Sequence, residues 1–196
     1  MIIEDGTGSG FRLKIDAENR AAVFADTRSM IAHYAAHDQE AYIGAVPYST
    51  ISGAGGRMFY LKNTRPGNVL ILSTIFTSWN GGLITGTKCV YGTMYSGDAA
   101  PTGRAVQSYL GNLHSGSGNV ADADVYYWDG TGTGMEITGG SPGAFAIMSK
   151  GFTPVDYDNS FLLAYNDSLS IHATPEETGV FAITLSAYFV PNVDIR

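Results

Sequence analysis

The chain has 196 residues, a length that fits one domain and lets it bury roughly 70% of its unfolded surface without disulfides or metals. Hydrophobic residues make up 44% and charged residues only 15%, so Gly, Ser, Thr, Asn and Tyr must build much of the surface. The 18 acidic and 11 basic side chains give a formal charge of -7, which argues against binding to a nucleic-acid backbone.

The single cysteine, Cys89, excludes an internal disulfide framework. The N-terminus has neither a basic segment nor an apolar run of signal-peptide length, so we expect synthesis in a reducing cytoplasm without export by that route. No stretch approaches the roughly 18 apolar residues that a membrane span needs, and we predict no membrane partner.

Residues 1–10 are rich in glycine and polar side chains, and we predict that they form a flexible N-terminal arm. Alternating polar and apolar residues from Phe11 to Asp16 predict a first strand, with Ala21–Phe24 as its hairpin partner. One short helix is predicted from Ser29 to His37, with Ser29 as its N-cap.

The rest of the chain reads as a succession of strands. Residues 180–190 alternate most clearly, whereas residues 69–76 are apolar on both faces, as in a central strand buried from both sides. The predicted strands are Tyr42–Val46, Arg57–Asn63, Val69–Phe76, Lys88–Tyr95, Asp124–Trp128, Ala144–Met148, Phe161–Tyr165, Ser168–His172 and Val180–Val190.

Glycine-rich and proline-containing turns separate these strands, and Gly97–Asn119 is predicted to be a long excursion from the sheets. Eight or nine strands at this spacing, without intervening helices, predict an all-β fold, an antiparallel β-sandwich over residues 11–196.

No catalytic or metal-binding constellation is complete. His33 and His37 have the four-residue spacing of two zinc ligands, but Tyr34 stands where a zinc protease has its glutamate base. Residues 81–88 are rich in glycine but lack the Gly-Lys-Ser/Thr order of a phosphate-binding loop. Cys89 has no histidine near it in sequence. We therefore predict no enzyme activity, no cofactor and no metal.

Aromatic residues at strand ends are the best candidates for binding. Trp79, Tyr126 and Trp128 lie beside glycine-rich loops, where they could stack on a sugar or anchor a protein interface. Core filling is the alternative for about half of such aromatics, because they also alternate into any sandwich core.

One resemblance to a known family is visible near the N-terminus. The segment Asp5-Gly6-Thr7-Gly8-Ser9-Gly10, followed by Lys14-Ile15-Asp16 and Asn19-Arg20, resembles the start of a group of tailed-bacteriophage virion structural proteins. Those chains open with D-G-T-G-x-G, then K-V-D and N-R-L, so Ala21 departs from the usual Leu. The strand end Tyr60-Leu61-Lys62-Asn63 is also similar to that group, and beyond it the likeness is one of pattern.

The resemblance implies a jelly-roll sandwich entered by an arm, often trimeric, on a capsid exterior or around a tail. It also implies that Asp5–Gly10 and the first strands, beginning at Phe11, contact neighbouring subunits. We therefore predict a non-enzymatic virion protein, made in the host cytoplasm: a capsid decoration or cement protein whose partners are itself, as a homotrimer, and the major capsid protein or another virion protein. A tail, collar or baseplate location is an alternative, as is a host-recognition module that binds glycans.

Overall fold

The computed structural model describes residues 3–4, 12–13, 39–51, 56–81, 84–93, 101–103, 105–130, 134–137, 141–148, 151–175 and 177–192. Its named elements are all β-strands, so the all-β prediction is confirmed. The predicted helix and the predicted strand at 21–24 lie outside the described residues. No helix among the residues described is long and apolar enough to cross a membrane.

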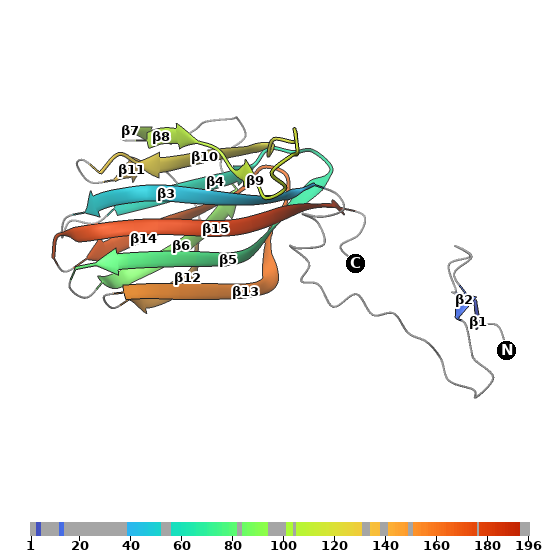
Figure 1. Cartoon of the computed structure of the whole chain (residues 1–196). Helices are drawn as coiled ribbons and strands as arrows, with labels where there is room; N and C mark the ends of the chain where they lie inside the picture. Colours follow the sequence, from blue (N-terminus) through green and yellow to red (C-terminus); the bar gives the residue numbers. More distant parts are fainter. Residues whose placement is uncertain are drawn as a thin grey trace.

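Two large antiparallel sheets pack together as a sandwich (Figure 1). The six-stranded sheet has the order β12 (Ser141–Met148), β6 (Ile84–Thr93), β14 (Asp167–Pro175), β4 (Gly56–Asn63), β10 (Ala123–Trp128) and β8 (Ala105–Ser108). The five-stranded sheet has the order β13 (Gly151–Leu163), β5 (Asn68–Asn80), β15 (Gly179–Pro191), β3 (Ala41–Ile51) and β9 (Gly111–Asn112). The predicted β-sandwich is thereby confirmed.

Two small ribbons complete the described strands. β7 (Thr102–Gly103) pairs with β11 (Met135–Glu136). β1 (Ile3–Glu4) pairs with β2 (Arg12–Leu13). Of the two, β2 lies within the stretch predicted to be the first strand of the sandwich. Neither β1 nor β2 pairs with a large sheet, so the first strand described in the sandwich is β3.

The long strands pair in reverse order of sequence. The first four pair with the last four as β3–β15, β4–β14, β5–β13 and β6–β12, all antiparallel. These pairs alternate between the two sheets, so the chain is arranged as one long antiparallel pair of strands that passes back and forth between the sheets. Between β6 and β12, the chain adds β10 beside β4, β8 beside β10, and β9 beside β3.

All nine strands predicted from residue 42 onward overlap an observed strand. The predicted excursion from Gly97 to Asn119 is corrected, because this stretch contains β7, β8 and β9, two of which extend the large sheets. These strands are two to four residues long, too short for an alternating pattern to stand out.

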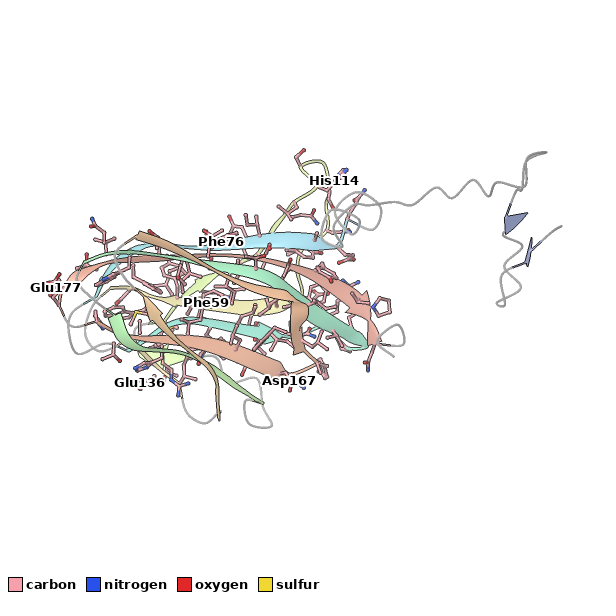
Figure 2. The ribbon with its side chains drawn as sticks, turned by 90° about the horizontal axis from the view of Figure 1, so that it is seen from below. Phe59, Phe76, His114, Glu136, Asp167 and Glu177 are labelled. Carbon is pink, nitrogen blue, oxygen red and sulfur yellow. The ribbon has the colours of Figure 1, made fainter. Side chains whose placement is uncertain are left out.

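The main core lies between the sheets, where Figure 2 shows Phe59 among the packed side chains. β15 supplies one wall, because its odd-numbered residues from Phe181 to Phe189 are buried while its even-numbered residues from Val180 to Ser186 are half-buried on the other face. The facing wall comes from the middle strands of the six-stranded sheet: Phe59 and Leu61 on β4, Val125 on β10, and Leu169 and Ile171 on β14.

The prediction of a strand buried on both faces is confirmed for the first half of β5. Leu70 and Leu72 belong to the main core, whereas Val69 and Ile71 belong to a second apolar cluster with residues of β3 and β15. Further along, Thr74 and Phe76 are half-buried. The opposite surface of the five-stranded sheet is therefore apolar without being wholly covered.

Candidate interaction surfaces

The aromatic residues predicted to bind a partner are not together on the surface. Trp79 and Trp128 are only 1% and 2% exposed and belong to the main core, so for them the expectation of an exposed platform is wrong and core filling is right. Tyr126 is partly buried and packs against the same core. Residues 5–11, the other predicted contacts, lie outside the described residues.

Two glycines make room for Trp79. A Cβ added at Gly81 or at Gly179 would lie 2.4 Å from a carbon of the Trp79 ring, closer than real Cβ contacts come. The indole therefore packs against bare backbone from both residues. Sequence reasoning read Gly81 and Gly179 as turn residues, and the structure shows that their lack of a Cβ also makes room for the Trp79 ring.

The exposed side of the five-stranded sheet is a candidate surface. Register places alternate residues of its three middle strands there, and we call this surface the β5–β15–β3 face. Its half-buried and exposed members are Ile43, Ala45 and Thr50 on β3, Thr74, Phe76, Ser78 and Asn80 on β5, and Val180, Ala182, Thr184 and Ser186 on β15. None of these side chains is charged. At the sheet edge, the register sets Asp156 on β13 opposite Thr74.

Apolar side chains are exposed where β9 joins this face. Ile43 pairs with Gly111 and is 42% exposed. Leu113 donates its backbone N–H to the Ala41 carbonyl at 2.9 Å and is 41% exposed. Tyr109, just before β9, is more exposed still. Side chains of this size on the surface are candidates for burial by a partner.

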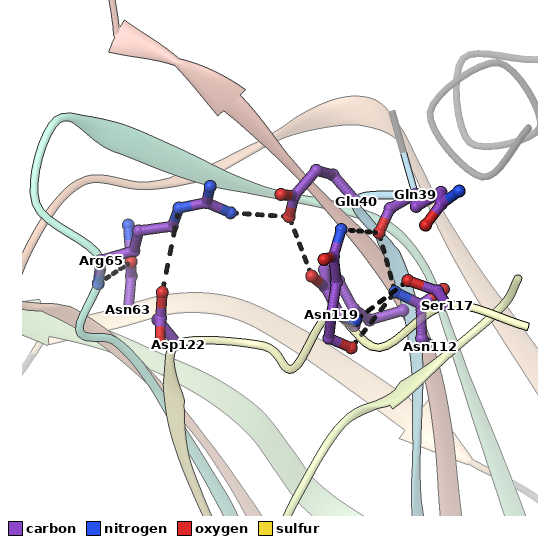
Figure 3. A network of polar contacts seen from close by, with 9 residues as sticks. Gln39, Glu40, Asn63, Arg65, Asn112, Ser117, Asn119 and Asp122 are labelled. Atoms are coloured by element: carbon purple, nitrogen blue, oxygen red, sulfur yellow. Dashed lines mark hydrogen bonds and ion pairs between the residues drawn. The ribbon is translucent and has the colours of Figure 1, made fainter. Parts of the chain in front are cut away.

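One end of the sandwich holds a polar network, shown in Figure 3. The Arg65 guanidinium donates to the Glu40 carboxylate at 2.6 Å and lies 3.9 Å from the Asp122 carboxylate. It also stands over the Phe189 ring, 5.1 Å from the centroid. The hydrogen bond to Glu40 is the main reason that the pKa of Arg65 is raised. This arrangement joins the residue before β3, the β4–β5 turn, the segment before β10, and β15.

A loop is fastened at the same end. The Asn112 side-chain amide donates to the Gln39 carbonyl at 2.7 Å, and Asn119 donates to the same carbonyl at 3.2 Å (Figure 3). Ser117 Oγ accepts from the Asn119 backbone N–H at 3.0 Å. Gln39 has φ 56°, a left-handed backbone that its surroundings must hold in place. The network therefore orders the loop after β9 and has a structural role.

The six-stranded sheet presents a different arrangement. Tyr126 stands opposite Tyr60 and Asp124 opposite Lys62, and the two tyrosine rings are tilted with centroids 6.2 Å apart. Tyr60 is 1% exposed, and its hydroxyl has no hydrogen-bond partner among the residues described. Burial raises the pKa of Tyr60 to about 12, and the nearby Ser168 hydroxyl reduces this increase. The two hydroxyls are not placed to form a hydrogen bond of good geometry. Burial, together with the Asp124 charge, also raises the pKa of Tyr126.

No group of three or more His, Cys, Asp and Glu side chains in the described part of the chain could hold a metal ion. His172 Nε2 lies 3.1 Å from Thr174 Oγ1, and His33 and His37 are outside the described residues. Cys89 is on β6, opposite Ile171.

Comparisons with protein-family models, with curated proteins and with solved structures gave no match.

Proposed function

We propose that this chain is a non-enzymatic structural protein of a virion, a capsid decoration or cement protein that binds a phage shell as a homotrimer. The observation that carries the proposal is the reverse-order pairing of the eight long strands across two sheets. This pairing supports the jelly-roll connectivity implied by the resemblance at residues 5–20, and jelly rolls are frequent among viral capsid domains.

The β5–β15–β3 face gives the proposal a second support. A chain with a formal charge of -7 is repelled by any other acidic surface, yet this face has no charged side chain on its three middle strands. A face without charges costs less to desolvate than one that carries them. Surfaces of this kind suit permanent assembly into a larger particle.

In the proposed mechanism, each subunit contributes weak contacts that symmetry repeats. The sandwich buries apolar surface against its neighbours, while Asp5–Gly10 and Phe11 lie on the underlying shell. Several attachments on one oligomer raise the overall affinity without any single strong contact. A tail, collar or baseplate position would use the same contacts.

Co-sedimentation with phage particles that lack the protein tests this proposal. Saturable binding at a stoichiometry set by the particle's symmetry is the expected result, and electron cryomicroscopy of the reconstituted particles would then locate the chain. Binding should weaken when residues 1–10 are deleted, and thermal unfolding of the deleted variant provides the folding control. Absence of saturable binding to the particles would refute the proposal.

A glycan-binding host-recognition module is the second candidate. Lectins also use jelly rolls, and the half-buried Tyr126 lies two residues from Asp124 on β10, which combines aromatic and polar groups as sugar sites do. A glycan array should be probed with the natural chain and with Tyr126→Ala, because replacing the buried Trp128 would disturb the core. Tyr109→Ala, which removes an exposed tyrosine elsewhere, is the matched control. Binding lost only in Tyr126→Ala would favour this candidate.

A further inference from the structure

We propose that the β5–β15–β3 face is the surface through which copies of this chain pack against one another. The inference rests on the proposed function for one point only, namely that copies of the chain associate with one another. It identifies the surface that becomes buried between the subunits.

Part of the face is open to a partner. Ile43 is 42% exposed, and Ala45 and Thr50 on the same strand are also exposed. Thr184 and Ser186, on the central strand β15, are half-buried, in contrast to the buried residues on the core side of that strand.

Charge favours a second copy as the occupant. Two copies that each carry a formal charge of -7 repel one another, and the repulsion is least where neither presents a charged side chain. The middle strands of the face meet this condition. A basic partner would instead be expected on a face with acidic side chains, so the face has no feature that would recognise it.

The sheet edges direct association toward the faces. Pro142 lies on β12 and Pro154 on β13, and both of these are edge strands. Pro47 lies in β3, which β9 covers only at Tyr42 and Ile43. The remaining edge, β8, has only four residues. Proline and short strands oppose the addition of a further strand at an edge, so contacts between copies are expected to use a sheet face.

The side chains also suit packing of one sheet on another. Ala45, Ala182 and Ser186 are small, so another sheet or strand surface can approach to the usual spacing of about 10 Å. Apolar Ile43 at the side of the face adds surface whose removal from water stabilises the contact.

The test compares the mass of the full chain in solution with that of charge-adding variants, by sedimentation equilibrium over a wide concentration range. Ala45→Glu and Thr184→Glu each place a carboxylate on the face, and Ala45 is exposed enough for folding to tolerate the change. The double variant should dissociate at concentrations at least tenfold higher than the natural chain, and high salt should partly restore association by screening the new charges. Gln107→Glu, an equal charge change at an exposed position on β8, should leave the mass unchanged. Circular dichroism and thermal unfolding verify that each variant folds.

The outcomes separate this inference from the proposed function. If the natural chain is an oligomer and Ala45→Glu and the double variant, both folded, remain oligomers of the same mass and affinity, the inference is overturned and the proposed function stands. If the natural chain is a monomer throughout, the homotrimer and the inference both fall, while co-sedimentation still decides whether the chain binds particles.

Discussion

The side-chain amide of Asn63 donates a buried hydrogen bond to the Leu163 carbonyl at 2.9 Å, and so joins β4 of one sheet to β13 of the other. The same amide nitrogen donates to the Asn68 carbonyl at 2.9 Å, and Oδ1 accepts from the Arg65 backbone N–H. These hydrogen bonds all join the Asn63 side chain to backbone groups. Asn63 thereby fixes the β4–β5 turn and the spacing of the two sheets at this end.

Replacement of Asn63 should be costly. Asn63→Ala leaves two carbonyls and one N–H without their partner, and should lower the free energy of unfolding by about 2 to 3 kcal/mol. Denaturant unfolding followed by circular dichroism measures it. Asn119→Ala, which removes an exposed amide from the loop network, is the control and should change stability by less than about 1 kcal/mol. Equal effects of the two variants would contradict this account of Asn63.

Loss of the hydroxyl should affect the stability of the chain differently at two buried tyrosines. Tyr42 donates to the Glu40 carboxylate at 2.8 Å, so Tyr42→Phe should destabilise the chain by about 1 kcal/mol. The Tyr60 hydroxyl is unpaired among the described residues, so Tyr60→Phe should leave stability unchanged or raise it. Thermal unfolding of both variants at neutral pH provides the comparison. A clear loss of stability in Tyr60→Phe would show that its hydroxyl has a partner.

Stability should decline in alkali because burial raises the pKa of Tyr60 to about 12 and also raises that of Tyr42. Below pH 10, both phenols are protonated in the folded and unfolded chain. Above it, the unfolded chain releases protons that the folded chain retains, so the free energy of unfolding falls as pH rises from about 10 to 12. Melting temperatures across this range measure the effect, and Tyr60→Phe should reduce the slope. A melting temperature that did not fall between these pH values would contradict the raised pKa.

Replacement of Gly179, which lies beside the Trp79 ring, should destabilise the chain. Gly179→Ala would place Cβ 2.4 Å from the Trp79 ring and 2.8 Å from the Asn80 carbonyl oxygen, so the ring or the strand must move. The expected destabilisation is about 1 to 3 kcal/mol, with an altered tryptophan emission spectrum. Gly118→Ala meets nothing within 4 Å and is the control, expected to be neutral. An unchanged melting temperature and spectrum in Gly179→Ala would mean that the ring has room to spare.

The alternation of apolar residues predicted most of the sandwich because each long strand has one face in the main core. Residues 180–190 show this directly, with Phe181, Ile183, Leu185 and Phe189 all turned inward. The start of β13 was missed, since Pro154 and the acidic residues at 156 and 158 interrupt any apolar run. The order of the strands was not predictable by these means, because pairing between β3 and β15 leaves no trace in either segment alone.

The candidate surfaces were less predictable than the fold. Alternation identifies two faces of a strand but not which face a second sheet covers, so the packing of Trp79 against the backbone of Gly81 and Gly179 became visible only in the structure. The β5–β15–β3 face became visible only when register brought three separate segments together. Its lack of charge is a property of the assembled sheet, not of any one segment.

The reverse-order pairing of the long strands bears on how fast the chain reaches its native state. The β3–β15 pair joins residues near position 45 to residues near position 185, so its contacts form only after more than a hundred intervening residues have been confined. Loop-closure entropy must be overcome before such contacts give any stabilisation, which places β-sandwiches of this kind among slow folders, in the range of milliseconds to seconds. During that interval β5, with its run from Val69 to Leu72, is exposed to other chains. In a cell that makes this chain, the yield of folded protein would then depend on how concentrated the newly made chains are, because strand pairing within one chain competes with pairing between chains.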